Sequence, residues 1–187
     1  MTERFKFTQT SISGVWVVER SSFEDERGSF ARMFCTEEFR KIGLKKPIVQ
    51  INHSITKKKG TVRGMHFQLP PHAETKIVSC LKGAAFDVAV DLRCGSKTFL
   101  SWHGEKLSAK NMKSLIIPKG IAHGFQTLTN NCEFIYFVTE PYVPEAVRGI
   151  NARDKRIGIK WPLEITCLSE KDKKNMSIND DYNGVSL

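Results

Sequence analysis

The stretch KIVSCLKGAAFDVAVDLR, residues 76–93, decides the fold class of this chain. It is rich in β-branched residues. In its second half large apolar residues alternate with alanine and aspartate, which is the pattern of a β-strand with two different faces. The tripeptide LKG (81–83) is typical of a hairpin turn. The stretch therefore predicts two short antiparallel strands joined by a turn.

Short segments of the same kind recur along the chain. Residues 14–19, 113–118, 123–129 and 132–140 are β-branched or aromatic and are separated by Gly, Pro or Asn, with a second hairpin-like turn at TNN (129–131). The clearest helix is CTEEFRKIGL (35–44), where Thr36 can cap and Gly43 can end the helix. Many short strands with little helix predict an antiparallel sandwich or barrel. The polar stretch 168–183 predicts a short helix or loop on the outside.

Composition limits the class of protein. A chain of 187 residues, 40% of them hydrophobic, predicts a single domain over 1–187. The five scattered cysteines contain no CxxC pair and predict free thiols in the cytoplasm, and no apolar run is long enough for a membrane helix. The net charge is +9, but the lysines are dispersed. A phosphorylated small substrate explains the arginines as well as a polynucleotide would.

The hexapeptide RGMHFQ (63–68) places polar residues in a segment that otherwise resembles a buried strand. In a regular strand Arg63 and His66 would point to opposite faces, but Gly64 could form a bulge that restores a common face. This strand would then line a pocket, with His66 as a proton-abstracting base and Arg63 holding an anionic substrate. A lone histidine beside a strand can instead be a structural residue.

The segment IIPKGIAHGF (116–125) resembles half of the cupin signature, in which the histidine, here His123, is usually a metal ligand. The other half should supply an H-x-H pair and a glutamate. Instead His66 and His72 lack that spacing, and Lys76 stands where an acid would be wanted. A cationic lysine disfavours a divalent ion. The pattern predicts a cupin barrel without a metal.

The segment EFIYFVTEPY (133–142) predicts a strand with Phe134, Tyr136 and Val138 on one face. Tyr136 could pack there with its hydroxyl hydrogen-bonded. Its phenol could equally act as a proton donor.

Together the chain resembles the dTDP-4-dehydrorhamnose 3,5-epimerase family. The matching segments keep a specific order and spacing; they are 23–34, 49–54, 60–68, 76–99, 117–125, 133–142, 157–162 and 168–172. The resemblance implies a mainly β, metal-free cupin or jelly-roll barrel with a few short helices. It also implies an isomerase that needs no cofactor, binds neither nucleic acid nor membrane, and forms a homodimer with a shared active site. The substrate would be a nucleoside-diphospho 4-keto-6-deoxy sugar, which loses a proton at C3 or C5 to form an enolate.

The resemblance also implies roles for individual residues. His66 would be the base, Tyr136 the acid on the opposite side of the sugar, and Lys76 the donor to the enolate oxygen. Asp172 of LSEKD would be the carboxylate partner of His66, with Asp154 as the alternative. The substrate-binding residues implied in the same way are Arg63, His123, Gln50, Asn52 and Tyr142, together with Arg27 and Phe30, which would reach the nucleotide of the neighbouring subunit.

Several alternatives remain open from the sequence. An epimerase that inverts C3 alone needs the same base and acid, and a ketoisomerase, a sugar-binding cupin without catalysis and a metal dioxygenase use related barrels. Pro141 stands where the family often has a tyrosine, so the nucleotide base and the sugar, hexose or heptose, are also open.

Overall fold

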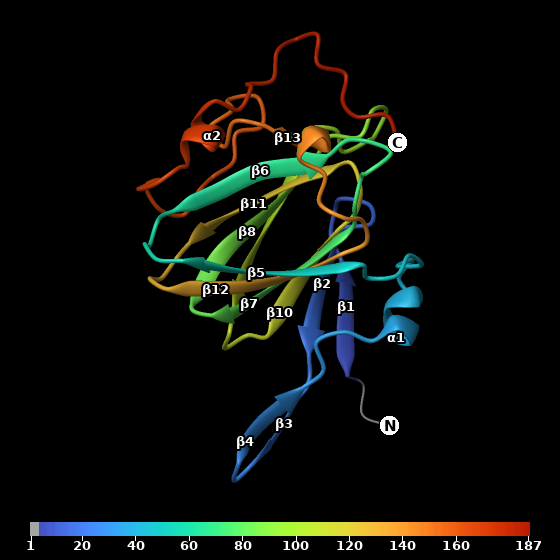
Figure 1. Cartoon of the computed structure of the whole chain (residues 1–187), viewed down its shortest axis with the longest axis vertical. Helices are drawn as coiled ribbons and strands as arrows, with labels where there is room; N and C mark the ends of the chain where they lie inside the picture. The colour runs from blue at the N-terminus through green and yellow to red at the C-terminus, as the bar shows by residue number, and fades with distance from the viewer. Residues whose placement is uncertain (1–3) are drawn as a thin grey trace.

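The computed structural model describes residues 4–187 and contains two antiparallel sheets that face each other (Figure 1). The six strands of the first sheet are, in spatial order, β1 (Phe5–Gln9), β2 (Trp16–Arg20), β10 (Lys113–Ile117), β7 (Lys76–Lys82), β12 (Cys132–Val138) and β5 (Gln50–Thr56). The five strands of the second are β13 (Val147–Gly149), β6 (Val62–Gln68), β11 (Ile121–Thr127), β8 (Ala84–Asp91) and β9 (Trp102–Ser108).

The central eight strands pair in a nested order. Strand β5 pairs with β12, β6 with β11, β7 with β10, and β8 with β9. The pairs alternate between the two sheets, as if one long hairpin had been wrapped around the core. This is the jelly-roll arrangement of cupins, so the predicted fold class is confirmed.

Both predicted hairpin turns are wrong in one respect. Gly83 and Asn131 do adopt positive φ angles of 78° and 53° in tight turns. However, β7 and β8 lie in different sheets, and so do β11 and β12, so neither turn joins paired strands. Turn-forming residues specify a chain reversal, whereas the strand with which the chain then pairs is set by tertiary packing.

The core has three parts, and β8 contributes to two of them. Its Ala85 and Ala89 pack between the two sheets, while Val88 and Val90 face outward and are covered by the C-terminal segment from Ile150 to Val185. A third cluster lies between the six-stranded sheet and the helix around Phe39. The larger apolar face of the 85–91 alternation therefore faces the C-terminal segment, and its alternate face, which carries Asp87, faces the space between the sheets.

The helices are short, as predicted. Helix α1 (Thr36–Arg40) begins one residue earlier than the capping pattern suggested, because Cys35, and not Thr36, is the N-cap residue. Cys35 makes no side-chain capping bond. The C-terminal segment carries α2 (Glu170–Lys173) on the outside, and a 3-10 turn spans Pro144–Ala146. The hairpin of β3 (Ser22–Asp25) and β4 (Gly28–Ala31) projects away from the barrel (Figure 1).

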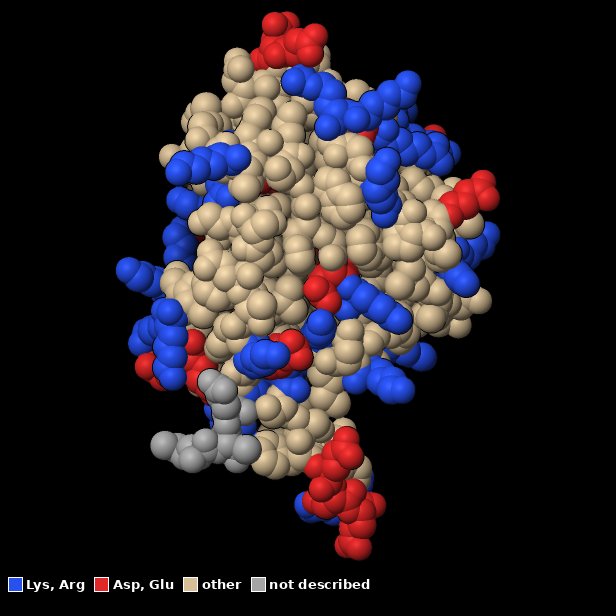
Figure 2. Space-filling view, turned by 180° about the vertical axis from the view of Figure 1, so that it is seen from behind, with Lys and Arg blue, Asp and Glu red and all other residues tan. Residues whose placement is uncertain are grey.

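The surface agrees with the dispersed charge of the sequence. On the face turned away in Figure 1, lysine and arginine side chains lie singly or in small groups around a broad, mostly uncharged area (Figure 2). Among residues 4–187, no helix has the length and hydropathy required to cross a membrane.

The bulge predicted at Gly64 is confirmed. His66 of β6 lies opposite His123 of β11, and Arg63 lies opposite Phe125, so two residues of β6 face the single residue Gly124. Gly64 has φ 127°, and a Cβ atom there would lie 2.5 Å from the Cα atom of Gly124. The extra residue brings Arg63 and His66 to the same side of the sheet.

We expect Gly64→Ala to lower the free energy of unfolding by about 2–4 kcal/mol, because it adds a backbone clash to an unfavourable φ. Gly28→Ala is the matched control, because Gly28 has φ 124° and nothing within 4 Å of the added Cβ. It should cost about 1 kcal/mol. Urea unfolding followed by circular dichroism measures both. Equal losses of unfolding free energy would show that the close approach of β6 to β11 adds nothing to the cost of the unfavourable φ.

Candidate active site

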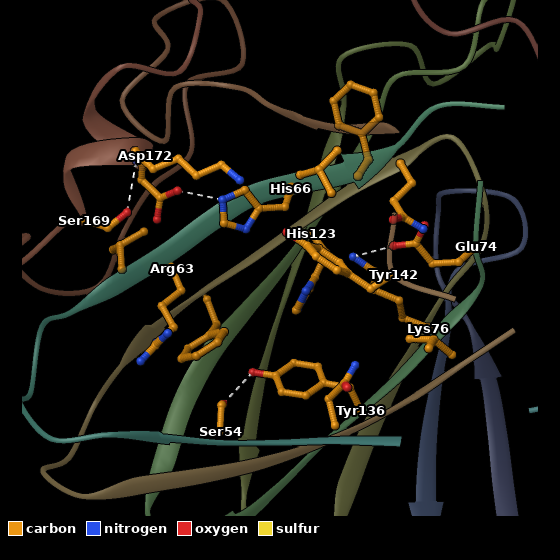
Figure 3. A pocket seen from close by; sticks show the side chains of 18 of the residues that line it. Ser54, Arg63, His66, Glu74, Lys76, His123, Tyr136, Tyr142, Ser169 and Asp172 are labelled. Atoms are coloured by element: carbon orange, nitrogen blue, oxygen red, sulfur yellow. Dashed lines mark hydrogen bonds and ion pairs between the residues drawn. The ribbon is translucent and has the colours of Figure 1, made fainter. Parts of the chain in front are cut away.

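A cavity of about 550 Å³ opens between the two sheets. Strands β5, β6, β7, β11 and β12 line it, and residues 167–172 of the C-terminal segment close one side. Figure 3 shows that ionisable side chains from both sheets converge on this space. An interior this polar is typical of a barrel that binds a ligand rather than one filled by apolar side chains.

His66 and Asp172 form a close pair at one wall of the cavity (Figure 3). His66 Nε2 lies 2.6 Å from Asp172 Oδ1, and the Asp172 side chain is only 5% exposed, whereas His66 is 35% exposed. The other ring nitrogen, Nδ1, points into the cavity (Figure 3). The carboxylate therefore orients the imidazole from behind and leaves one nitrogen for chemistry.

Local structure positions Asp172 for this contact. Ser169 is the N-cap of α2, and its Oγ accepts a hydrogen bond from the Asp172 amide at 3.0 Å. Burial alone would raise the pKa of Asp172, but the hydrogen bond and charge of His66, with weaker bonds from the Gly64 and Ser169 groups, lower it. Asp172 therefore remains a carboxylate near neutral pH.

Asp154, the alternative partner, lies elsewhere. Its oxygens accept backbone N–H groups of Arg156 and Ile157 at 2.9 and 3.1 Å and of Ile178 at 2.6 Å. It joins the segment after β13 to the C-terminal stretch and does not line the cavity. The structure brings Asp172, and not Asp154, to His66.

Tyr136 of β12 lies on the wall opposite His66 (Figure 3). Its hydroxyl is 3.0 Å from Ser54 Oγ of the neighbouring strand β5. Burial raises the pKa of Tyr136, and this effect outweighs the hydrogen bond from Ser54, which lowers it. The phenol therefore keeps its proton at neutral pH and can donate it.

His123, which lines the cavity, forms a second histidine–carboxylate pair with the fully buried Asp87. His123 Nε2 is 3.0 and 3.1 Å from the two oxygens of Asp87, and both side chains are buried. Burial raises the pKa of Asp87, although the charge and hydrogen bond of His123 act against it. Sequence analysis had assigned no role to Asp87; the signal available was its place on the alternate face of the 85–91 strand.

Lys76 enters the cavity at the start of β7 (Figure 3). Its Nζ is 2.8 Å from Glu74 Oε1, and the two side chains are 18% and 6% exposed. Glu74 was also missed by sequence analysis, although it lies two residues before Lys76 and, in an extended chain, shares its face. Lysine and glutamate together present a donor and an acceptor to the same region.

Most of the expected substrate-binding residues gather at the rim. Arg63 is held by bonds from Nε to Thr56 Oγ1 (3.0 Å) and from Nη2 to the Ile55 carbonyl (3.3 Å). Gln50 donates to Asn52 Oδ1 at 2.8 Å and accepts the Tyr142 amide at 3.1 Å. Together with His123, these residues line the same cavity.

Arg27 and Phe30 do not reach this cavity. They lie on the projecting β3–β4 hairpin, where Arg27 is paired with Asp25 at 2.6 Å and Phe30 is 71% exposed. Phe30 lies opposite Phe23 in this hairpin, and its side chain is left largely open to solvent within the described part of the chain, residues 4–187.

Gln68, the last residue of RGMHFQ, makes three hydrogen bonds to backbone groups of the rim. Its Nε2 donates to the carbonyls of His72 (2.9 Å) and Pro141 (3.1 Å), and its Oε1 accepts the Val143 amide at 2.7 Å. This buried amide joins two rim loops, so it is a structural residue of the site.

Nowhere in residues 4–187, the cavity included, are three His, Cys, Asp or Glu side chains placed to hold a metal ion.

Comparisons with known proteins identify the family of this chain. A family model described as dTDP-4-dehydrorhamnose 3,5-epimerase matches residues 9–180. A dTDP-4-dehydrorhamnose 3,5-epimerase of Shigella flexneri is 44% identical over 176 residues, which are 93% of this chain and 97% of that protein.

Two solved structures are also similar. A dTDP-4-dehydrorhamnose 3,5-epimerase from Bacillus anthracis with TDP and PPi bound has a TM-score of 0.90 and 37% identity, covering 93% of this chain and 99% of that one. A dTDP-6-deoxy-D-glucose-3,5-epimerase from Legionella pneumophila in complex with dTDP-4-keto-L-rhamnose has a TM-score of 0.86 and 39% identity, covering 90% and 89%.

The lowered pKa of Asp172 predicts a pH-dependent stability. The contribution of its carboxylate is complete above the ordinary pKa of 3.8 and is lost as pH falls through the lower pKa of the folded state. The difference in unfolding free energy between the wild type and Asp172→Asn should therefore be constant above about pH 5 and shrink below about pH 4. Urea unfolding at a series of pH values measures it. A difference that stays constant into strong acid would mean that Asp172 is not ion-paired.

Proposed function

Because the chain belongs to the dTDP-4-dehydrorhamnose 3,5-epimerase family, we propose that His66 and Tyr136 carry the two proton transfers of its reaction. The protein is an isomerase with 3,5-epimerase activity on dTDP-linked 4-keto-6-deoxy sugars. The observation that carries the residue assignment is geometric. A histidine backed by a buried carboxylate and a protonated phenol face the same cavity from opposite walls.

The substrate ketone makes the first step possible. The C4 carbonyl acidifies the hydrogens at C3 and C5, and removing one of them leaves an enolate with its charge on the C4 oxygen. His66 takes this proton through Nδ1, and the Asp172 carboxylate stabilises the imidazolium that forms. Removal of the proton is thus assigned to the wall formed by β6.

The second step needs a proton on the opposite face. A single base cannot readily remove a proton from one face and return it to the other. Tyr136 is suited to deliver it, because its raised pKa keeps it protonated and Ser54 holds its hydroxyl. Lys76 stabilises the enolate oxygen between the two steps, in a partly dry site where fixed charges are most effective.

The rim residues suit the nucleotide part of the substrate. Arg63 carries a fixed positive charge for the diphosphate, and Gln50, Asn52 and Tyr142 offer amide and aromatic groups beside it. His123 lines the inner part of the cavity. An enzyme inverting C3 alone would use the same base and acid, so the stereochemistry of the product, read by NMR, distinguishes that case.

We further propose that the chain acts as a homodimer with shared sites. Strand β5 is the edge of its sheet. Val49, just before the strand, and Ile51 and Ile55 along it are 51%, 57% and 54% exposed. A second copy would cover these apolar side chains. The projecting β3–β4 hairpin would then carry Arg27 and Phe30 to the partner's cavity.

A cytoplasmic location is also proposed, supported by free thiols at Cys35, Cys80, Cys94, Cys132 and Cys167.

Deuterium exchange tests the two proton carriers. In D₂O, His66→Ala should slow exchange at C3 and C5 of a dTDP-4-keto-6-deoxy sugar by about 10²–10⁴-fold, because the base is lost. Tyr136→Phe should keep this exchange but lose inversion. Tyr182→Phe is the control and should change neither, because Tyr182 lies in the C-terminal segment, packs against the cluster outside β8 and does not line the cavity. Normal exchange in His66→Ala, or normal inversion in Tyr136→Phe, would reject the corresponding role. NMR reads both.

Mixing two inactive variants tests the shared site. His66→Ala removes the base from its own cavity, and Arg27→Ala combined with Phe30→Ala alters the hairpin that enters the partner's cavity. A mixed dimer would contain one intact site, so refolding the two proteins together should restore about a quarter of wild-type activity. If the mixture stays as inactive as its parts, although light scattering shows dimers, the hairpin does not complete a neighbouring site.

A further inference from the structure

The ion pair of Lys76 and Glu74 contains one atom that the proposed mechanism does not use. Glu74 Oε1 is occupied by Lys76 at 2.8 Å, but Oε2 is fully buried and has no hydrogen-bond partner among residues 4–187. The side chain is 6% exposed and lines the cavity. Burying a carboxylate oxygen without a hydrogen-bond partner costs free energy. Such an atom in a residue that lines a binding cavity indicates that a bound ligand supplies the missing hydrogen-bond donor.

The backbone holds Glu74 and Lys76 in place. Between them, Thr75 donates its amide to Thr139 Oγ1 at 2.9 Å and accepts the Thr139 amide at 3.1 Å. This pair of bonds fixes the chain just before β7. Because residues two apart in an extended chain share a face, Glu74 and Lys76 both point into the cavity (Figure 3). The position of the free oxygen is therefore built into the sheet.

The pair offers a donor and an acceptor side by side. A ketone with a hydroxyl on the next carbon presents the complementary arrangement, an acceptor beside a donor. If Lys76 donates to the C4 oxygen, as proposed above, the group next to it on the sugar ring is the C3 hydroxyl. We propose that Glu74 Oε2 accepts a hydrogen bond from this C3 hydroxyl, so that Glu74 is a specificity-determining residue for α-hydroxyketone substrates. The assignment rests on the proposed role of Lys76.

A substrate that lacks the hydroxyl tests this proposal. The probes are the 4-keto-6-deoxy sugar nucleotide and its 3-deoxy analogue, with deuterium exchange at C5 as the readout for both. The wild type should prefer the 3-hydroxy compound by roughly ten- to a hundredfold in kcat/KM, the range expected for a hydrogen bond to a charged group. The 2-deoxy analogue is the control for loss of a hydroxyl elsewhere on the ring and should behave like the parent compound.

The variant Glu74→Gln supplies one oxygen where the carboxylate supplied two. It should lose most of the preference for the 3-hydroxy compound, measured as the ratio of kcat/KM for the 3-hydroxy and the 3-deoxy compounds. Glu133→Gln makes the same substitution in another lysine–glutamate pair, that of Glu133 on β12 with Lys82 on β7, and should keep the full preference. Thermal unfolding checks that both variants are folded, and Glu74→Asp, which keeps both oxygens, is the substitute if Glu74→Gln is not.

The outcomes separate this inference from the proposed function. If the wild type exchanges C5 equally well in both compounds, the hydroxyl is not recognised and the inference fails, although the base and acid assignments stand. If Glu74→Gln slows both compounds by the same factor, Glu74 only positions Lys76, and the inference fails again. If neither compound exchanges at all, the proposed function itself is wrong.

Discussion

The close approach of β6 and β11 at Gly64 and Gly124 is the constraint on which the site depends. The extra residue of β6 at this point turns Arg63 and His66 to the same side, and the pairing places His123 directly opposite His66. No other residue fits at Gly64, because an added Cβ would meet the facing backbone at 2.5 Å. A local backbone irregularity thus converts a strand that would have filled a core into one that lines a cavity.

A polar cavity inside a barrel is stable here because its histidine and lysine side chains are paired with buried carboxylates. Burying an ionised group without a partner is very costly, whereas a paired group keeps a defined direction. The paired side chains are His66 with Asp172, His123 with Asp87 and Lys76 with Glu74. Each carboxylate approaches its partner from behind or beside it, so the side chains are oriented before substrate binds, as the proposed stabilisation of an enolate requires.

Much of the fold could be predicted because its signals are local. The alternation of residues 85–91, the glycine in RGMHFQ and the short polar segment around Asp172 each predicted a feature that the structure contains. The strands with which β7 and β8 pair could not be predicted, since sheet pairing joins strands far apart in sequence. Glu74 and Gln68 were missed for a similar reason: a glutamate or glutamine in a loop or strand carries no signal of what it will contact.

The sequence by itself determined the family, the fold class and the chemical types of the side chains proposed for catalysis, because these follow from residue identity and from motifs kept in order. Only the tertiary structure decided which groups meet. It brought Asp172, rather than Asp154, to His66 across 106 positions of chain, set Tyr136 on the facing wall, and left one oxygen of Glu74 free. Distances between side chains from different strands depend on how two sheets close around a core, and that closure is a property of the whole chain.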